Sequence, residues 1–279
     1  MTDRYCVMGN PVEHSKSPWI HARFAELTGQ DLRYDRLQVL PGDFPRAVHA
    51  FRAEGGHGCN VTVPFKFEAA ALATRRSARA QLAQACNTLR FDGHEMFGDN
   101  TDGVGLVSDI TGNAGVAIAG RELLLIGAGG AAAGVLGPLI EARPRRIVVA
   151  NRSHQGAMDL VQRHSELGRE HGVALATCAL DAVPGAFDLV VNATATSLGG
   201  GGVPVSDGVL RPRTLACDLM YGPLARGFLD WAQRHGAVPR DGLGMLVEQA
   251  AEAFRVWRGV RPPSAAVLAE LRALMDSQP

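Results

Sequence analysis

The amino-acid sequence predicts an α/β protein, for three reasons. Short apolar stretches with the period of strands alternate with segments of helical period along the chain. A glycine-rich turn follows the nearly continuous apolar stretch at residues 122–126, which is typical of a parallel strand covered on both faces. The length of 279 residues exceeds the roughly 100–150 of a usual single domain. We therefore expect two domains, one of them doubly wound and Rossmann-like.

Composition favours a small-molecule partner. Lys+Arg and Asp+Glu balance at 28 each, which argues against nucleic-acid binding and against a charged membrane surface. The five cysteines form no C-x-x-C pair, which argues against a structural zinc site and for a reducing compartment. The N-terminus has no apolar leader, and no apolar stretch reaches the roughly 18–20 residues that span a bilayer. We expect a cytoplasmic protein without a bound metal.

The first half alternates strands and helices. We expect strands at residues 5–9, 33–39 and 60–63, helices at 18–28, 43–54 and 69–85, and a hairpin of 87–91 with 95–98. Asp102 then opens an apolar helix. An aspartate at that position can simply accept the first backbone N–H groups of the helix, so a capping role is the main alternative to a functional one.

Lys66 stands out by residue type. Among the 28 basic side chains only Lys16 and Lys66 are lysines, the others being arginines. Arginine replaces lysine at most exposed positions but cannot exchange a proton, so a retained lysine indicates a need for a titratable amine. Lys66 follows the predicted strand 60–63, near Thr62 at its C-terminal end. Ligands bind at that end of the strands in open α/β sheets, so both residues are candidates for a site.

The second half begins with a dinucleotide-binding pattern. After the strand at residues 122–126 come Gly127, Ala128, Gly129, Gly130 and Ala131, then a helix to about residue 142 and a second strand at 146–150. Glycine lets the backbone approach a pyrophosphate at the N-terminus of the helix. Later strands at 173–177, 187–193 and 214–219 extend the sheet. Four glycines at 199–202 predict a mobile loop.

The residues after the second strand predict the cofactor. An acidic residue there would bind the ribose 2′-hydroxyl of NAD, but the sequence has Asn151, Arg152 and Ser153. A guanidinium and a hydroxyl suit a 2′-phosphate, and the guanidinium can also stack on adenine. NADP is therefore the predicted cofactor. An arginine that is merely solvated would explain the charge but not the missing carboxylate.

Several motifs in order resemble the shikimate dehydrogenase family over nearly the whole chain. They are Gly-Asn-Pro-Val-Glu-His-Ser-Lys-Ser-Pro at 9–18, Asn-Val-Thr-Val-Pro-Phe-Lys at 60–66, Cys-Asn-Thr-Leu at 86–89, Asp-Asn-Thr-Asp-Gly-Val-Gly-Leu at 99–106, the glycine turn, Asn-Arg-Ser, and Asp-Gly-Leu-Gly-Met-Leu-Val-Glu-Gln-Ala at 241–250. The sequence departs from the family pattern at Glu13, Ala78 and residues 225–229.

The resemblance implies a domain organisation and a set of site residues. It implies a substrate domain at residues 1–103, an NADP domain at 104–242, C-terminal helices at 243–279 that return to the substrate domain, and an active site in the cleft. For the substrate it implies Ser15, Ser17, Thr62, Asn87, Asp102, Tyr221 and Gln249. For the cofactor it implies Gly127, Ala128, Gly129, Gly130, Ala131, Asn151, Arg152, Ser153, Leu219 and Gly242.

Lys66 and Asp102 match the catalytic pair of the family. Its reaction is the reversible NADPH-dependent reduction of 3-dehydroshikimate to shikimate, in which a lysine ammonium can stabilise the developing oxygen charge and donate the proton. Two alternatives stay open: a quinate or aminoshikimate dehydrogenase with relaxed cofactor use, and an NADP-binding sensor that has lost catalysis. Retention of both Lys66 and Asp102 argues against the sensor. We expect a monomer or homodimer.

Overall fold

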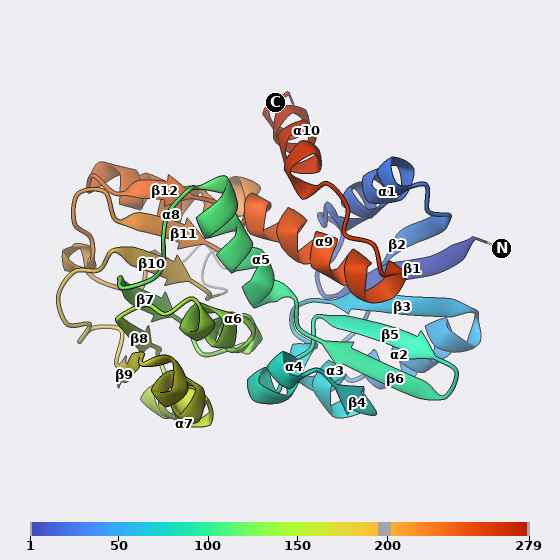
Figure 1. Cartoon of the computed structure of the whole chain (residues 1–279), viewed down its shortest axis with the longest axis horizontal. Helices are drawn as coiled ribbons and strands as arrows, with labels where there is room; N and C mark the ends of the chain where they lie inside the picture. Colours follow the sequence, from blue (N-terminus) through green and yellow to red (C-terminus); the bar gives the residue numbers. More distant parts are fainter. Residues whose placement is uncertain (1, 195–201, 278–279) are drawn as a thin grey trace. The chain divides into compact units, whose positions relative to one another are not determined.

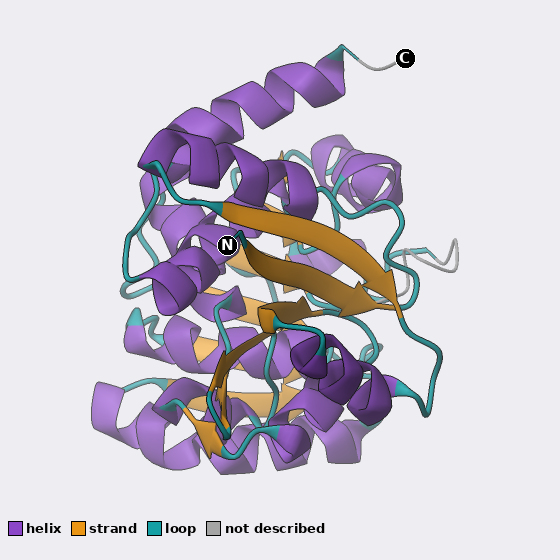
Figure 2. Cartoon of the chain, turned by 90° about the vertical axis from the view of Figure 1, so that its right-hand side faces the viewer, coloured by secondary structure: helices purple, strands orange, loops and turns teal. Residues whose placement is uncertain are grey.

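The computed structural model describes residues 2–194 and 202–277. The chain divides into two compact units, the first made of Met1–Gly105 with Leu246–Pro279 and the second of Leu106–Met245. The first unit is therefore discontinuous in the sequence. Figures 1 and 2 show the strands of each unit flanked by helices.

The first unit contains a mixed six-stranded sheet with the order β2-β1-β3-β5-β6-β4. Its strands are β1 (Asp3–Gly9), β2 (Leu32–Gln38), β3 (Gly56–Val61), β4 (Arg75–Arg76), β5 (Thr88–Asp92) and β6 (Glu95–Asp99). Strands β2, β1 and β3 run parallel, whereas the β5–β6 hairpin pairs antiparallel with β3. The parallel half places the segments that follow β1 and β3 at one edge of the sheet.

Helices of the first unit follow the strands, as the sequence predicts. They are α1 (Ser17–Thr28), α2 (Phe44–Ala53), α3 (Lys66–Leu72), α4 (Ala78–Ala83), α10 (Ser264–Asp276) and most of α9 (Leu243–Arg258). Pro18 lies in the first turn of α1, where its missing N–H costs nothing, and Gly29 ends the helix with a positive φ of 63°.

The single helix predicted at residues 69–85 is wrong. The structure has two short helices, α3 and α4, separated by strand β4, which pairs with β6. Thr74 fixes the break, because its hydroxyl bonds to both the backbone N–H and the carbonyl of Met96. Ser77 then caps α4 by accepting from the Ala80 N–H at 3.2 Å. Pairing with the sheet overrides the helical propensity of this Ala- and Arg-rich segment.

The second unit contains a six-stranded sheet with the order β12-β11-β10-β7-β8-β9, and all its pairings are parallel. Its strands are β7 (Glu122–Ile126), β8 (Arg146–Ala150), β9 (Ala174–Cys178), β10 (Leu189–Asn192), β11 (Leu215–Asp218) and β12 (Val238–Arg240). In chain order within the unit this is the 3-2-1-4-5-6 arrangement of the Rossmann fold, which reverses between β7 and β10. The predicted Rossmann-like domain is confirmed.

Helices α6 (Gly130–Glu141), α7 (His154–His171) and α8 (Arg226–Arg234) connect the strands of the second unit. Helix α5 (Asp102–Ser108) and the first turn of α9 lie where the chain passes from one unit to the other. Within the described residues, no helix is long and apolar enough to cross a membrane.

His21 is a fully buried titratable group in the core of the first unit. Its ring stacks on Tyr34 with centroids 4.3 Å apart and planes 7° apart, and Phe24 and Trp257 also lie against it. Burial disfavours the charged imidazolium and lowers the pKa of His21 to about 3. The core therefore requires this histidine to be neutral.

His21 is expected to make the protein sensitive to acid. Because the folded-state pKa lies below the unfolded value of 6.5, the unfolded chain binds this proton first, and stability is lost as pH falls below about 6.5. We expect His21 to lower the free energy of unfolding by an amount on the order of 2 kcal/mol between pH 7.5 and pH 4.5. Urea unfolding of the wild type and of His21→Phe at both pH values measures how much of the pH-dependent loss of stability is due to His21. Equal losses in the two proteins would contradict the assignment.

Candidate active site

Lys66 is the first residue of α3 and lies just past the C-terminal end of β3. The preceding Phe65 is fully buried and stacks on Phe44, with ring centroids 4.9 Å apart. The carbonyl of Lys66 accepts from the Cys86 N–H at 2.8 Å. Phe65 on one side and Cys86 on the other therefore fix the backbone that carries the lysine.

Lys66 pairs with Asp102, the first residue of α5. The ammonium Nζ donates to Asp102 Oδ2, and the two side chains are only 13% and 7% exposed. The other carboxylate oxygen accepts from Asn87 Nδ2 at 2.8 Å. The backbone N–H of Asp102 donates to Asn100 Oδ1 at 3.1 Å. Both oxygens of Asp102 are thus engaged by side chains of the candidate site.

Asn87 is the centre of a buried amide network. Its Nδ2 lies 2.9 Å from Thr101 Oγ1 and 3.2 Å from Gln249 Oε1, while its Oδ1 accepts from the Thr101 N–H at 2.9 Å. Helix α9 supplies Gln249, although this residue is more than 140 positions away from the others in the sequence. The structure therefore brings together four predicted residues, namely Lys66, Asn87, Asp102 and Gln249.

Thr101 is a member of this network that the sequence analysis did not single out. It is fully buried, and its hydroxyl lies 3.2 Å from Asn87 Oδ1 and 3.3 Å from Gln249 Oε1. A signal for it exists in the sequence, because Thr101 stands in the polar Asp-Asn-Thr-Asp segment at residues 99–102, where α5 begins. Four polar residues in a row at a buried helix entrance indicate a specific hydrogen-bonding task.

Ser15, Ser17 and Thr62 follow the two neighbouring parallel strands β1 and β3. Ser17 is buried, and its N–H donates to Ser15 Oγ at 3.3 Å. Thr62 lies against Gly9, where an added Cβ would come within 2.3 Å of the threonine methyl. Among the described residues, no hydrogen bond joins these three side chains to the Lys66 network. They share with Lys66 the carboxyl edge of the parallel strands.

The glycine turn of the second unit joins β7 to the N-terminus of α6. Gly127 directly follows β7 with φ of 113°, and an added Cβ would lie 3.1 Å from the Ala193 carbonyl oxygen. Gly129 is the N-cap of α6, and the space where its Cβ would stand is open. Backbone N–H groups at a helix N-terminus favour an anion, so Gly127, Ala128, Gly129, Gly130 and Ala131 fit a dinucleotide pyrophosphate.

Asn151, Arg152 and Ser153 follow β8, the strand next to β7. Asn151 Nδ2 donates to the Ser153 carbonyl at 2.9 Å, and Ser153 caps α7 by accepting from the Gly156 N–H at 3.4 Å. Arg152 is exposed. The turn thus has fixed polar ends and presents a guanidinium to solvent, as binding of a 2′-phosphate would require.

Leu219 and Gly242 lie side by side in the second unit. An added Cβ on Gly242 would be 2.3 Å from the Leu219 carbonyl oxygen, so only glycine fits there. The Gly242 N–H donates to the Met220 carbonyl at 2.8 Å. Tyr221 is half-buried and precedes a short 3-10 turn. Of the predicted glycine loop at 199–202, residues 199–201 lie outside the described residues.

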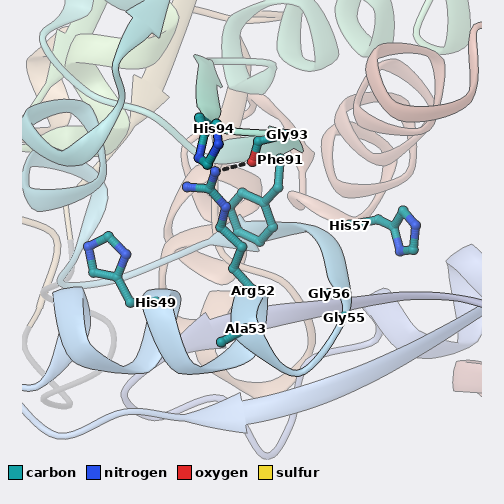
Figure 3. Close-up of a pocket in the computed structure, with 9 residues that line it drawn as sticks. All are labelled: His49, Arg52, Ala53, Gly55, Gly56, His57, Phe91, Gly93 and His94. Atoms are coloured by element: carbon teal, nitrogen blue, oxygen red, sulfur yellow. Dashed lines mark hydrogen bonds between the residues drawn. The ribbon is translucent and has the colours of Figure 1, made fainter.

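A separate hollow of about 560 Å³ contains none of the predicted site residues (Figure 3). It lies near the start of β3, where Arg52 at the end of α2 donates to the Gly93 carbonyl in the hairpin turn. Lys66 follows the opposite end of the same strand. His49 and His57 also line this hollow. In the part of the chain that the structure describes, no group of three or more His, Cys, Asp or Glu residues could hold a metal ion.

Family models match three parts of the chain. The shikimate dehydrogenase substrate binding domain matches residues 7–89, the shikimate/quinate 5-dehydrogenase model residues 109–198, and the shikimate 5′-dehydrogenase C-terminal domain residues 242–272. The shikimate dehydrogenase (NADP(+)) of Acidovorax sp. (strain JS42) is 63% identical over 271 residues, which cover 97% of this chain and 96% of that protein. The chain belongs to the shikimate dehydrogenase family. The predicted family is confirmed.

Solved structures of similar proteins share the fold. A crystal structure of an Ael1 enzyme from Pseudomonas putida superposes with a TM-score of 0.87 at 45% identity, covering 97% of this chain and 98% of that one. The shikimate 5-dehydrogenase of Thermus thermophilus in complex with NADP(H) and shikimate superposes with a TM-score of 0.84 at 30% identity, covering 98% and 99%. These matches confirm the predicted α/β fold class for the residues that the structure describes.

Proposed function

We propose that this chain catalyses the reversible NADPH-dependent reduction of 3-dehydroshikimate to shikimate, with Lys66 and Asp102 acting at the reacting carbonyl. The enzyme class and the NADP cofactor follow from membership of the family. The observation that carries the residue assignment is the nearly buried Lys66–Asp102 pair, hydrogen-bonded to Asn87 at the carboxyl edge of the first sheet.

The chemistry explains why a lysine and an aspartate occur together. NADPH, when bound, supplies the hydride for the ring carbonyl carbon. The ammonium of Lys66 stabilises negative charge on the carbonyl oxygen and donates the proton that oxygen needs, and in the reverse direction the neutral amine accepts it. Asp102 holds Nζ in place through Oδ2. A fixed donor costs no reorganisation at the moment of reaction.

The first unit supplies the groups that hold the substrate. In this proposal Ser15 and Ser17 bind the carboxylate, and Thr62, Asn87, Asp102 and Gln249 bind ring hydroxyls. Tyr221 is a further proposed substrate-binding residue. Asn87 Nδ2 carries two protons but has three acceptors within 3.2 Å, so one of these acceptors can accept a hydrogen bond from a substrate hydroxyl instead. Such a network can recognise a polyhydroxylated ring.

The second unit would hold the dinucleotide. Gly127, Ala128, Gly129, Gly130 and Ala131 would bind its pyrophosphate, Asn151, Arg152 and Ser153 its 2′-phosphate, and Leu219 and Gly242 the nicotinamide end. The open space at Gly129 and the exposed Arg152 support this arrangement. The proposed domains accordingly have residues 1–103 with 243–279 for the substrate and 104–242 for NADP.

Arg152→Leu is expected to raise the KM for NADP+ by about tenfold or more while changing the KM for NAD+ less than about twofold, because only NADP carries the 2′-phosphate that the guanidinium would pair. Steady-state kinetics with both cofactors measure the KM for NADP+ and the KM for NAD+ in each variant. Arg145→Leu is a matched control, since Arg145 is an exposed arginine of the same unit that pairs with Glu122. A parallel rise in both KM values would rule out a phosphate-specific role.

The function itself is tested by following nicotinamide absorbance with shikimate and with quinate, each against NADP+ and NAD+. We expect turnover to be highest with shikimate and NADP+. Faster turnover of quinate, or of an aminoshikimate in a further assay, would reassign the substrate within the family. No turnover with any pair would leave the sensor alternative and refute the proposal.

The assembly and the compartment belong to the same proposal. We propose a monomer or homodimer, which sedimentation at enzyme concentrations used in the assay distinguishes. A reducing cytoplasmic compartment is supported by the five cysteines, all of which are free. Burial raises the pKa of Cys217 and Cys86 to about 12, which makes these two thiols poor nucleophiles.

A further inference from the structure

A buried cluster of charges in the first unit takes no part in the proposed chemistry. The guanidinium of Arg79 on α4 donates through Nε and Nη2 to the two carboxylate oxygens of Asp99, at 2.7 and 2.6 Å. Nη2 also donates to Glu252 Oε1 on α9 at 3.0 Å. Asp99 and Glu252 are each 3% exposed. Glu252 also pairs with Arg255 and Arg261, at 2.7 and 3.2 Å. Burying such ion pairs is weak evidence for stability, and their contacts indicate another role.

Asp99 transmits the position of Arg79 to the start of α5. The Oδ1 of Asp99 accepts from the Asn100 N–H at 2.7 Å as well as from Arg79. Asn100 Oδ1 in turn accepts from the Asp102 N–H at 3.1 Å, and Asn100 Nδ2 donates to the Ala85 carbonyl at 2.9 Å. A chain of hydrogen bonds thus runs from Arg79 to the backbone of Asp102, whose carboxylate holds Lys66.

Glu252 connects the same arginine to the helix that carries Gln249. Gln249 and Glu252 are three positions apart on α9 and therefore lie on one face of this helix. Gln249 contacts Asn87 and Thr101, while Glu252 accepts from Arg79 and from Arg255. The hydrogen bond from Arg255 is the main reason that the pKa of Glu252 falls to about 2, so Glu252 is ionised at all working pH values.

We propose that Arg79 is a positioning residue for the reduction, because it clamps the loop of Asp99 and Asn100 to α9 and so sets Asp102 and Gln249 in register around the substrate. The inference rests on the proposed roles of Lys66 and Asp102. Arg79 touches neither substrate nor cofactor in this scheme. It acts through Asp99. A planar guanidinium can donate one hydrogen bond to each carboxylate oxygen of Asp99 at the same time, whereas a lysine ammonium cannot reproduce this bidentate geometry.

Replacing the Arg79 guanidinium by another group is expected to displace Asp102 by a fraction of an ångström or more. Since a displacement of about 1 Å can cost about 10²-fold in rate, Arg79→Lys is expected to lower kcat by roughly 10–100-fold. The KM for shikimate should rise with it, because Gln249 is displaced too, whereas the Kd for NADP+ should stay within about twofold, since the dinucleotide residues lie in the other unit.

The experiment compares Arg79→Lys, Arg79→Ala and the matched control Arg75→Ala. Arg75 belongs to the same segment but forms an exposed ion pair with Glu95, so its removal should leave kcat and KM unchanged. For Arg79→Ala, guanidinium chloride at about 20 mM, well below the molar concentrations that unfold proteins, should restore at least about a tenth of the lost kcat. Ammonium chloride at the same concentration should not, because ammonium cannot reproduce the bidentate geometry. A requirement for positive charge alone would not distinguish the two salts.

Wild-type kcat and KM in a folded Arg79→Lys protein would overturn the proposal, and this variant decides alone if Arg79→Ala fails to fold. Equal effects of the two salts on a folded Arg79→Ala protein would also overturn it. Failure of the proposed function is separable, because it would appear as no turnover in the wild type, and failure of the role of Lys66 would appear as full activity in Lys66→Ala. Loss of activity in Lys66→Ala with full activity in Arg79→Lys would reject the positioning role only.

Discussion

Lys66→Ala is expected to lower kcat for shikimate oxidation by about 10³-fold while the KM for shikimate changes less than about threefold, because the lost interaction is made chiefly with the transition state. Truncation also leaves Asp102 without its ammonium partner in a nearly buried position. Stopped-flow or steady-state assays with saturating NADP+ measure both constants. A kcat within about tenfold of the wild type would refute the catalytic role of Lys66.

The scarcity of lysine in this chain provides a matched control. Lys16→Arg is expected to leave activity unchanged, because Lys16 at the N-cap of α1 makes no side-chain capping hydrogen bond and the replacement keeps its positive charge. Lys66→Arg keeps the charge beside Asp102 but cannot exchange a proton, so we expect it to be as inactive as Lys66→Ala within about tenfold. Comparable activity in both arginine variants would mean that charge alone suffices at Lys66.

Arg240→Leu is expected to destabilise the second unit by about 3–5 kcal/mol, the usual cost of leaving a buried charge without its partner. Arg240 on β12 donates through Nε and Nη2 to the two oxygens of Asp109, at 2.6 and 2.5 Å. These hydrogen bonds raise the pKa of Arg240, and the side chain of Asp109 is only 2% exposed. Urea unfolding followed by circular dichroism measures the loss.

A double replacement separates the charge penalty from the loss of contacts. Arg240→Leu combined with Asp109→Leu removes both charges, so it should recover a large part of the stability lost in Arg240→Leu. Arg145→Leu breaks an exposed pair with Glu122 and should cost less than about 1 kcal/mol. If the double variant is as unstable as the sum of its single variants, unpaired charge does not explain the effect.

The sequence predicts the central strands of the second unit closely but misses several of its other elements. Parallel strands buried on both faces are continuous apolar stretches, and the glycine turn fixes where β7 ends and α6 begins, so β7 and β8 begin and end at the predicted residues. Helices α7 and α8 and strand β12 were not anticipated. Strand β12 has only three residues and includes Pro239, which gives it no recognisable strand period.

In the first unit, local sequence patterns do not predict features that depend on contacts between distant residues. The segment at 69–85 has helical composition, and only its pairing with β6 breaks it into α3, β4 and α4. The candidate site was found through residue type at Lys66 and through motif order at Asp102. The residues Thr101, Asp99 and Arg79, which support this site, were not predicted. Hydrogen bonds between residues far apart in the sequence produce no periodic pattern of residue types that would reveal them. The roles of the individual site residues stay predictions.

The order in which the two units close during synthesis follows from the discontinuity of the first. Residues 106–245 are contiguous, so that unit is complete on the ribosome before the C-terminal segment emerges, whereas the sheet that bears Lys66 lacks α9 until then. Tyr5 and Trp257, whose ring centroids lie 4.6 Å apart in the finished core, are translated before and after the whole of the second unit. Although nascent chains generally fold from the N-terminus, here the unit that begins the chain is the last to be finished.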